Sequence, residues 1–196
     1  QMENSLQSIC VYCGSADGLD SIYLDAAFEI GKLFAENGIQ VVYGAGKTGL
    51  MGALADGALA SRGIVIGVVP DNLNLPQLIH SNLTELLTVP DIHQRKAKMS
   101  LLADAFMALP GGYGTFDELF ETLTWSQIGL HQKPLVLLNT NGYYDALLSM
   151  VNRARSDGFI YSEHLELFQS ASSPKEALDK IRSFTLPKGL ERWVDR

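Results

Sequence analysis

Short apolar runs alternate with amphipathic segments along most of the chain. The runs at 6–12, 40–43, 64–69, 106–109 and 133–139 are nearly continuous in apolar residues, as expected for strands buried on both faces of a sheet, and shorter candidates lie at 85–89 and 165–169. Helical spacing of apolar residues follows at 22–37, 50–61, 116–127 and 143–156. This alternation predicts an α/β fold with a doubly wound, mostly parallel sheet.

Capping signals mark where two further helices begin. Asp91, followed by Gln94 three residues later, predicts one N-terminus, and Ser173-Pro174 followed by Glu176 predicts another. No linker, repeat or low-complexity tract interrupts the pattern, so a single domain over 1–196 is expected. Within it, 1–5 is expected to be disordered or added in cloning, because Gln precedes Met, and 186–196 is expected to be a C-terminal tail.

Composition excludes several partners. The 196 residues are 46% apolar and 19% charged, which is ordinary for a globular protein. The net charge of −7 gives no general attraction to nucleic acid or to anionic membranes. No apolar run approaches the roughly 20 residues of a membrane span, and the start lacks a signal-peptide pattern. We therefore expect a cytoplasmic protein with neither nucleic-acid nor membrane partners.

The cysteines and histidines indicate no metal site. Cys10 and Cys13 form a C-x-x-C, but they lie at the end of a predicted strand, where residues three apart point to opposite faces. We expect buried free thiols. The four histidines are scattered without ligand spacing.

The most informative stretch is the glycine loop from Pro110 to Thr115. Its three glycines let the backbone approach a ligand closely, and the following helix N-terminus is a plausible seat for a phosphate. Thr115 is expected to be the N-cap, with Glu118 at N3 in a capping box. Alternatively, the Glu118 carboxylate, one turn or about 5.4 Å beyond a bound phosphate, reaches the sugar carbon of a nucleoside 5′-monophosphate and stabilises an oxocarbenium-like cation or orients water. The residues alone leave both roles open.

Two further features allow more than one interpretation. Arg95, Lys96 and Lys98 crowd the start of a helix, where they form either a solvated cationic face or an anion contact. Gly44, Gly46 and Gly49 satisfy G-x-G-x-x-G between a strand and a helix, with Asp71 after the next strand. This second pattern supports an alternative function, a dinucleotide-binding oxidoreductase.

Taken together, these motifs resemble the LONELY GUY family of cytokinin riboside 5′-monophosphate phosphoribohydrolases, often labelled lysine decarboxylase-like. The resemblance is carried by PGGYGTFDE at 110–118, by Arg95-Lys96, by YGAGKTGLMG at 43–52, and by the segments 124–127 and 133–134. It implies a three-layer modified Rossmann fold and a homodimer or larger homo-oligomer. The implied reaction is hydrolysis of the N-glycosidic bond of an N6-modified adenosine 5′-monophosphate to free base and ribose 5-phosphate.

The resemblance also implies roles for particular residues. Glu118 and Arg95 would be the catalytic pair. The substrate-binding and phosphate-binding candidates are Gly111, Gly112, Gly114, Thr115, Gly44, Gly46, Lys96, Met99 and Ser15. No cofactor is expected, since hydrolysis needs only water and no context for a pyridoxal-phosphate lysine is present.

Two positions depart from the family pattern, and one further function stays open. Ala45 replaces the middle glycine of the second motif and is expected to narrow the approach to the ligand, while Ile92 stands where methionine is common. A carrier of a nucleotide or of molybdenum cofactor, without chemistry, is the remaining alternative.

Overall fold

A seven-stranded parallel sheet forms the centre of the computed structural model, which describes residues 6–194. The predictions for 1–5 and for the last two residues of the tail lie outside the described residues. The strands are β1 (Ser8–Tyr12), β2 (Gln40–Tyr43), β3 (Val65–Pro70), β4 (Glu85–Val89), β5 (Ala105–Ala108), β6 (Leu135–Leu138) and β7 (Gln169–Ala171). Their spatial order is β4-β3-β2-β1-β5-β6-β7, and every neighbouring pair is parallel. The predicted doubly wound α/β fold is confirmed.

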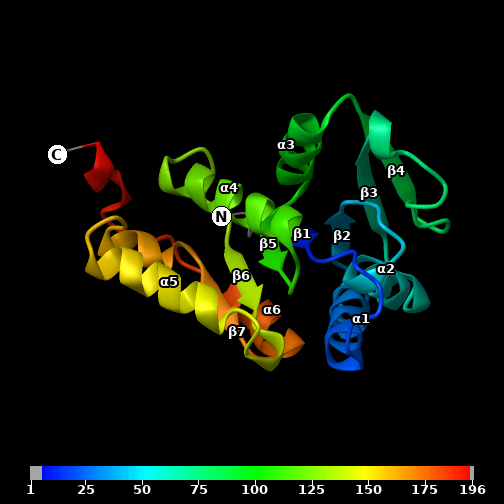
Figure 1. The fold of residues 1–196 in the computed structure, drawn as a ribbon, viewed down its shortest axis with the longest axis horizontal. Helices are drawn as coiled ribbons and strands as arrows, with labels where there is room; N and C mark the ends of the chain where they lie inside the picture. The colour runs from blue at the N-terminus through cyan, green and yellow to red at the C-terminus, as the bar shows by residue number, and fades with distance from the viewer. Residues whose placement is uncertain (1–5, 195–196) are drawn as a thin grey trace.

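Helices cover both faces of this sheet, which gives three layers (Figure 1). The α-helices are α1 (Ser21–Glu36), α2 (Gly49–Ala60), α3 (Ile92–Leu102), α4 (Tyr113–Gln127), α5 (Asp145–Ser156) and α6 (Pro174–Arg182). Short 3₁₀ helices lie at η1 (Asp71–Leu73), η2 (Thr140–Gly142), η3 (Ser162–Leu167) and η4 (Leu190–Trp193). Apolar residues of α1, α2 and α6 share one core with the sheet, and those of α3, α4 and α5 share the other. None of the helices in residues 6–194 has the length and apolar character needed to span a bilayer.

The two cysteines contribute to different cores. Cys10 packs with the α3–α5 side and Cys13 with the α1–α2 side, and both are buried free thiols, as predicted. The alternation of side chains along an extended chain accounts for this separation.

Two predicted helix caps are confirmed and one predicted strand is misplaced. The Gln94 amide donates to Asp91 Oδ1 at 2.8 Å, and the Glu176 amide donates to Ser173 Oγ at 3.3 Å. The strand expected at 165–169 is instead η3 followed by β7. His164 and Leu167 are the buried residues of η3, and their spacing of three is that of a 3₁₀ turn rather than of a strand.

Candidate active site

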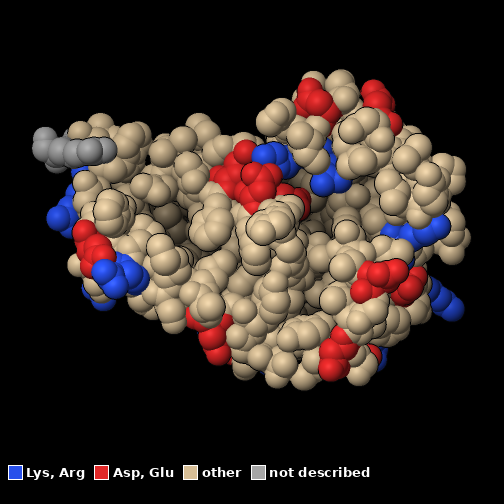
Figure 2. Space-filling model, viewed as in Figure 1, with Lys and Arg blue, Asp and Glu red and all other residues tan. Residues whose placement is uncertain are grey.

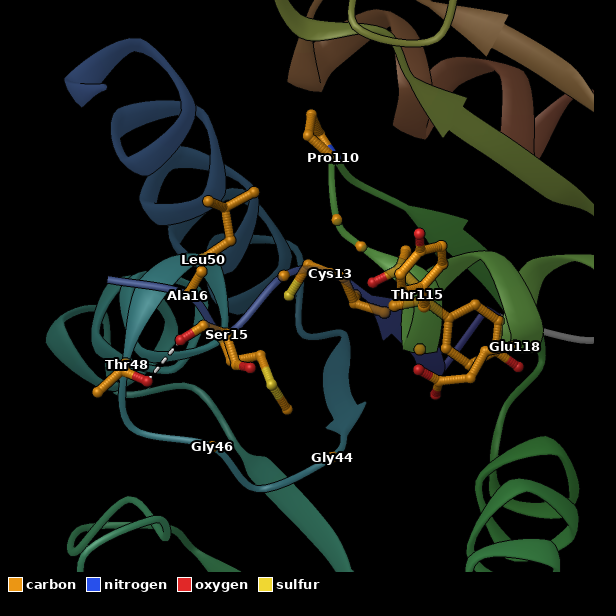
Figure 3. A pocket seen from close by; sticks show the side chains of 18 of the residues that line it. Cys13, Ser15, Ala16, Gly44, Gly46, Thr48, Leu50, Pro110, Thr115 and Glu118 are labelled. Atoms are coloured by element: carbon orange, nitrogen blue, oxygen red, sulfur yellow. Dashed lines mark hydrogen bonds between the residues drawn. The ribbon is translucent and has the colours of Figure 1, made fainter. Parts of the chain in front are cut away.

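A cavity of about 620 Å³ opens where the winding of the sheet reverses, between β1 and β5. The loops that follow β1, β2 and β5 surround it (Figure 3). These loops are tied together, because the Gly14 amide donates to the Pro110 carbonyl at 3.0 Å and the Met51 amide donates to the Gly14 carbonyl at 3.2 Å. The Thr48 hydroxyl also donates to the Ser15 carbonyl at 2.6 Å. Ligands of open α/β sheets bind at this kind of switch point.

Helix α4 begins earlier than the sequence suggested. Gly112 is its N-cap and Tyr113 its first residue, so Thr115 is the third residue of the helix and Glu118 the sixth. The predicted capping box is therefore wrong, and no side chain caps this helix. The physical reason is Gly111, whose missing side chain lets the chain turn into the helix within four residues of the end of β5.

The uncapped end of α4 faces the cavity. The amides of Tyr113, Gly114 and Thr115 have no carbonyl partner within the helix, and all three residues line the cavity. Gly111 has no room for a side chain, because a Cβ there would lie 2.1 Å from Thr115 Oγ1. The loop thus presents free N–H groups and the positive end of a helix dipole to the cavity, which is a suitable site for an anion.

Glu118 lines the same cavity, three residues after Thr115 and so on the same face of α4 (Figure 3). Burial raises the pKa of its carboxyl to about 7, the positive charge of Arg95 opposes this rise, and the neighbouring Asp117 adds to it. A carboxyl with such a pKa changes protonation state near neutrality, which is suitable for acid–base work.

Arg95 approaches the cavity from α3. Its Nε is buried and has no hydrogen-bond partner among the described residues. The ion pairs within residues 6–194 do not join Arg95 to Glu118, although the arginine charge lowers the pKa of that carboxyl. The guanidinium therefore has a donor available for a ligand beside Glu118.

Lys96 and Met99, the other two candidates on α3, do not line the cavity. Lys96 is buried and binds acidic side chains of α4, and Met99 is fully buried in the core. Consecutive helical residues point about 100° apart, so Arg95 and Lys96 cannot face the same surface. The structure does not place either residue beside the cavity.

Gly44 and Gly46 line the cavity, but the space beside them is already filled. A Cβ on either glycine would lie 2.8 Å from the Met51 side chain. Ala45 adopts a left-handed φ of 69° and is fully buried, with its methyl group next to Gly67. Ala45 is not among the residues that line the cavity, so the expected narrowing does not occur.

Sequence reasoning missed much of the cavity wall. Tyr23 and Tyr143 line it, and the Tyr143 hydroxyl donates to the Gly111 carbonyl. An apolar part of the wall comes from Leu73, Leu78 and Ile79, in the segment between β3 and β4. The sequence signal that could have indicated this part of the wall is the group of leucines that follows the end of β3.

Backbone hydrogen bonds hold the segment between β3 and β4 against the loop after β2. The His80 amide donates to the Ala45 carbonyl at 2.9 Å and the Lys47 amide to the Leu78 carbonyl at 3.1 Å. The apolar wall is therefore attached to the glycine motif at 44–46.

The parallel sheet, with a glycine loop at its switch point, defines a Rossmann-like α/β protein. Residues 51–181 match the family described as possible lysine decarboxylase, and the chain belongs to this family. The expected family is thereby confirmed.

Curated relatives are similar to this chain in sequence, and a solved structure is similar to it in fold. The chain is 43% identical over 184 residues to the cytokinin riboside 5′-monophosphate phosphoribohydrolase LOG of Oryza sativa subsp. japonica, covering 94% of this chain and 76% of the relative. It is 42% identical over 184 residues to the phosphoribohydrolase LOG1 of Arabidopsis thaliana, covering 94% and 86%. The molybdenum cofactor binding protein of Rippkaea orientalis has the same fold, with a TM-score of 0.69 at 23% identity over 92% of this chain and 98% of that one.

Proposed function

We propose that this protein hydrolyses the N-glycosidic bond of an N6-modified adenosine 5′-monophosphate, releasing the free base and ribose 5-phosphate. The observation that carries the proposal is the presence of a free helix N-terminus and the Glu118 carboxyl on one face of α4, in one cavity. The curated relatives named as cytokinin riboside 5′-monophosphate phosphoribohydrolases support the same reaction.

In this mechanism the 5′-phosphate binds at the first amides of α4. Glu118 lies five residues beyond Tyr113, about 7.5 Å along the helix axis, and its side chain leans back toward the N-terminus. The carboxylate stabilises the positive charge that develops on the ribose as the C1′–N9 bond breaks, and it orients the water that attacks C1′. Arg95 holds the carboxylate and the ribose or the leaving base in place.

The oxidoreductase alternative has less support from the cavity, and so has pyridoxal-phosphate chemistry. A dinucleotide site would use the backbone of Gly44 and Gly46, yet Met51 packs against both glycines. Asp71, the expected ribose-binding acid of that alternative, is exposed and does not line the cavity. No lysine is among the described residues of the cavity wall, so the cavity offers no amine for a pyridoxal-phosphate Schiff base.

A substrate panel tests the proposal. The protein is incubated with N6-isopentenyl-AMP, AMP, the corresponding diphosphate and the nucleoside without phosphate, and the products are separated by chromatography. We expect free base from the monophosphates and at least about 100-fold slower release from the nucleoside, because the phosphate contacts are lost. Nucleotides returned intact after long incubation would favour a carrier, and tight NAD or NADP binding without base release would favour an oxidoreductase.

We also propose a homodimer or larger homo-oligomer acting in the cytoplasm. Apolar side chains are prominently exposed on and near α3 and α4, with Tyr113 93%, Leu101 75% and Leu130 68% exposed. Light scattering should give at least twice the 21.4 kDa of one chain. The Leu101→Glu variant should dissociate the assembly, and a wild-type monomer at high concentration would contradict it.

A further inference from the structure

Helix α3 directs two successive cations to two different places. Arg95 lines the cavity, whereas Lys96, only 7% exposed, turns toward α4. Lys96 Nζ lies 3.0 Å from Asp117 Oδ2 and 2.9 Å from Glu121 Oε2. In Figure 2 basic side chains over α3 lie directly beside acidic side chains over α4. The two helices are therefore joined by a buried ammonium group that binds two carboxylates.

The two acids that bind Lys96 lie on either side of Glu118 in the sequence of α4. Asp117 precedes it and Glu121 follows three residues later, so all three carboxyl groups lie within five successive residues of the helix. Carboxylates four residues apart repel each other when nothing lies between them. Burial lowers the pKa of Lys96, but its hydrogen bonds to Glu121 and Asp117 outweigh this effect, and the net shift is upward. Lys96 therefore remains charged at neutral pH.

We propose that Lys96 is a positioning residue. Its ion pairs with Asp117 and Glu121, together called the clasp, hold the part of α4 that carries Glu118 against α3, and its charge offsets the two negative charges beside that carboxyl. Its catalytic consequence depends on the proposed hydrolysis, whereas the clasp itself depends only on the contacts between α3 and α4. Lys96 acts without touching the substrate, because it does not line the cavity.

The charged and titratable groups around Glu118 determine the sign of the effect. Loss of Lys96 leaves two uncompensated carboxylates beside Glu118 and so disfavours its ionisation. Conversely, amides at 117 and 121 remove the repulsion and favour ionisation. The charges that shift the pKa of Glu118 are those of Arg95 and Lys96 of α3 and of Asp117 and Glu121 of α4. Glu118 in turn raises the pKa values of Cys10, Tyr12 and Cys13 at β1.

The test follows the Glu118 carboxyl by ¹³C NMR titration, with its signal assigned from the Glu118→Gln variant. Lys96→Met should raise the titration midpoint of Glu118 by about half to one pH unit. The matched control is Lys98→Met, which removes the same charge from a partly exposed position on the same helix and should change the midpoint by less than about 0.2 unit. The double variant Asp117→Asn/Glu121→Gln, with Lys96 intact, should lower the midpoint.

These outcomes separate the clasp from the reaction. If the wild type hydrolyses nucleotides, Lys96→Met should move the acidic limb of kcat upward, so that activity falls several-fold at pH 7 and recovers at higher pH while KM changes little. An inactive wild type would overturn the hydrolase proposal, and the titration would still decide the clasp. A folded Lys96→Met variant in which Glu118 titrates with the same midpoint as in Lys98→Met would overturn the clasp. If Lys96→Met does not fold, an unchanged midpoint in the double variant would overturn it instead.

Discussion

The Glu118→Gln variant should lose about 10²- to 10⁴-fold in kcat for release of free base from N6-isopentenyl-AMP. The amide keeps the size of the side chain and most of its packing, but it can neither stabilise a ribosyl cation nor accept a proton from water. Because Glu118 does not cap α4, this loss is not explained by damage to the helix start. Chromatography of the products under single-turnover conditions measures the effect.

A matched control is Glu36→Gln, at the exposed end of α1, which should stay within about twofold of the wild type. Near-normal hydrolysis by Glu118→Gln would remove Glu118 from the reaction.

The same Glu118→Gln variant should be more stable than the wild type in mildly alkaline buffer. Because burial raises the pKa of Glu118 from its ordinary value of 4.5 to about 7, the folded protein favours the protonated form. The free energy of unfolding of the wild type therefore falls as the pH rises from about 4.5 through about 7, and the neutral amide avoids this loss. Urea unfolding should show a gain of about 2 kcal/mol at pH 8 that disappears near pH 4.5. A gain of equal size at both pH values would show that ionisation of Glu118 is not its cause.

The Arg95→Ala variant should lose about 10²- to 10³-fold in kcat/KM, as expected for removal of a charged donor from an enclosed site. Its Nε has no partner among the described residues, so the guanidinium is available to the substrate and to Glu118. Arg95→Lys should recover little activity, because an ammonium group lacks the planar arrangement of donors.

Added guanidinium chloride should partly restore Arg95→Ala but not Glu118→Gln. The control Arg155→Ala, on the exposed side of α5, should behave as the wild type. Full activity of Arg95→Ala without guanidinium would contradict the assigned role.

Hydrophobic patterning was sufficient for most of the fold. Strands buried on both faces are almost wholly apolar, and the predicted strand 40–43 coincides with β2. The predicted strand 85–89 coincides with β4, a more exposed strand at the edge of the sheet. The caps at Asp91 and Ser173 were predictable because a side-chain acceptor there satisfies a nearby backbone amide. Patterning failed at 165–169, where a short apolar run forms a 3₁₀ turn and the neighbouring β7 is defined by its pairing with β6.

The site was predictable where it depends on backbone and less so where it depends on side-chain direction. The glycine loop and Glu118 share a cavity, as the 110–118 motif indicated. Thr115 was misassigned as a cap because the rule favours a hydroxyl residue, whereas Gly112 ends the loop with no side chain at all. The direction of Lys96 depends on the start and rotation of α3, and its partners on α4 lie more than twenty residues away in the sequence.

The segment between β3 and β4 has a consequence for how such a protein can be re-engineered. Leu73, Leu78 and Ile79 contribute side chains to the cavity, yet the segment is attached to the glycine motif at 44–46 through main-chain groups. Substitution of these three residues therefore alters the shape of the chamber while leaving α3 and α4 untouched. Libraries confined to them vary the apolar wall of the cavity without substituting any residue of α3 or α4.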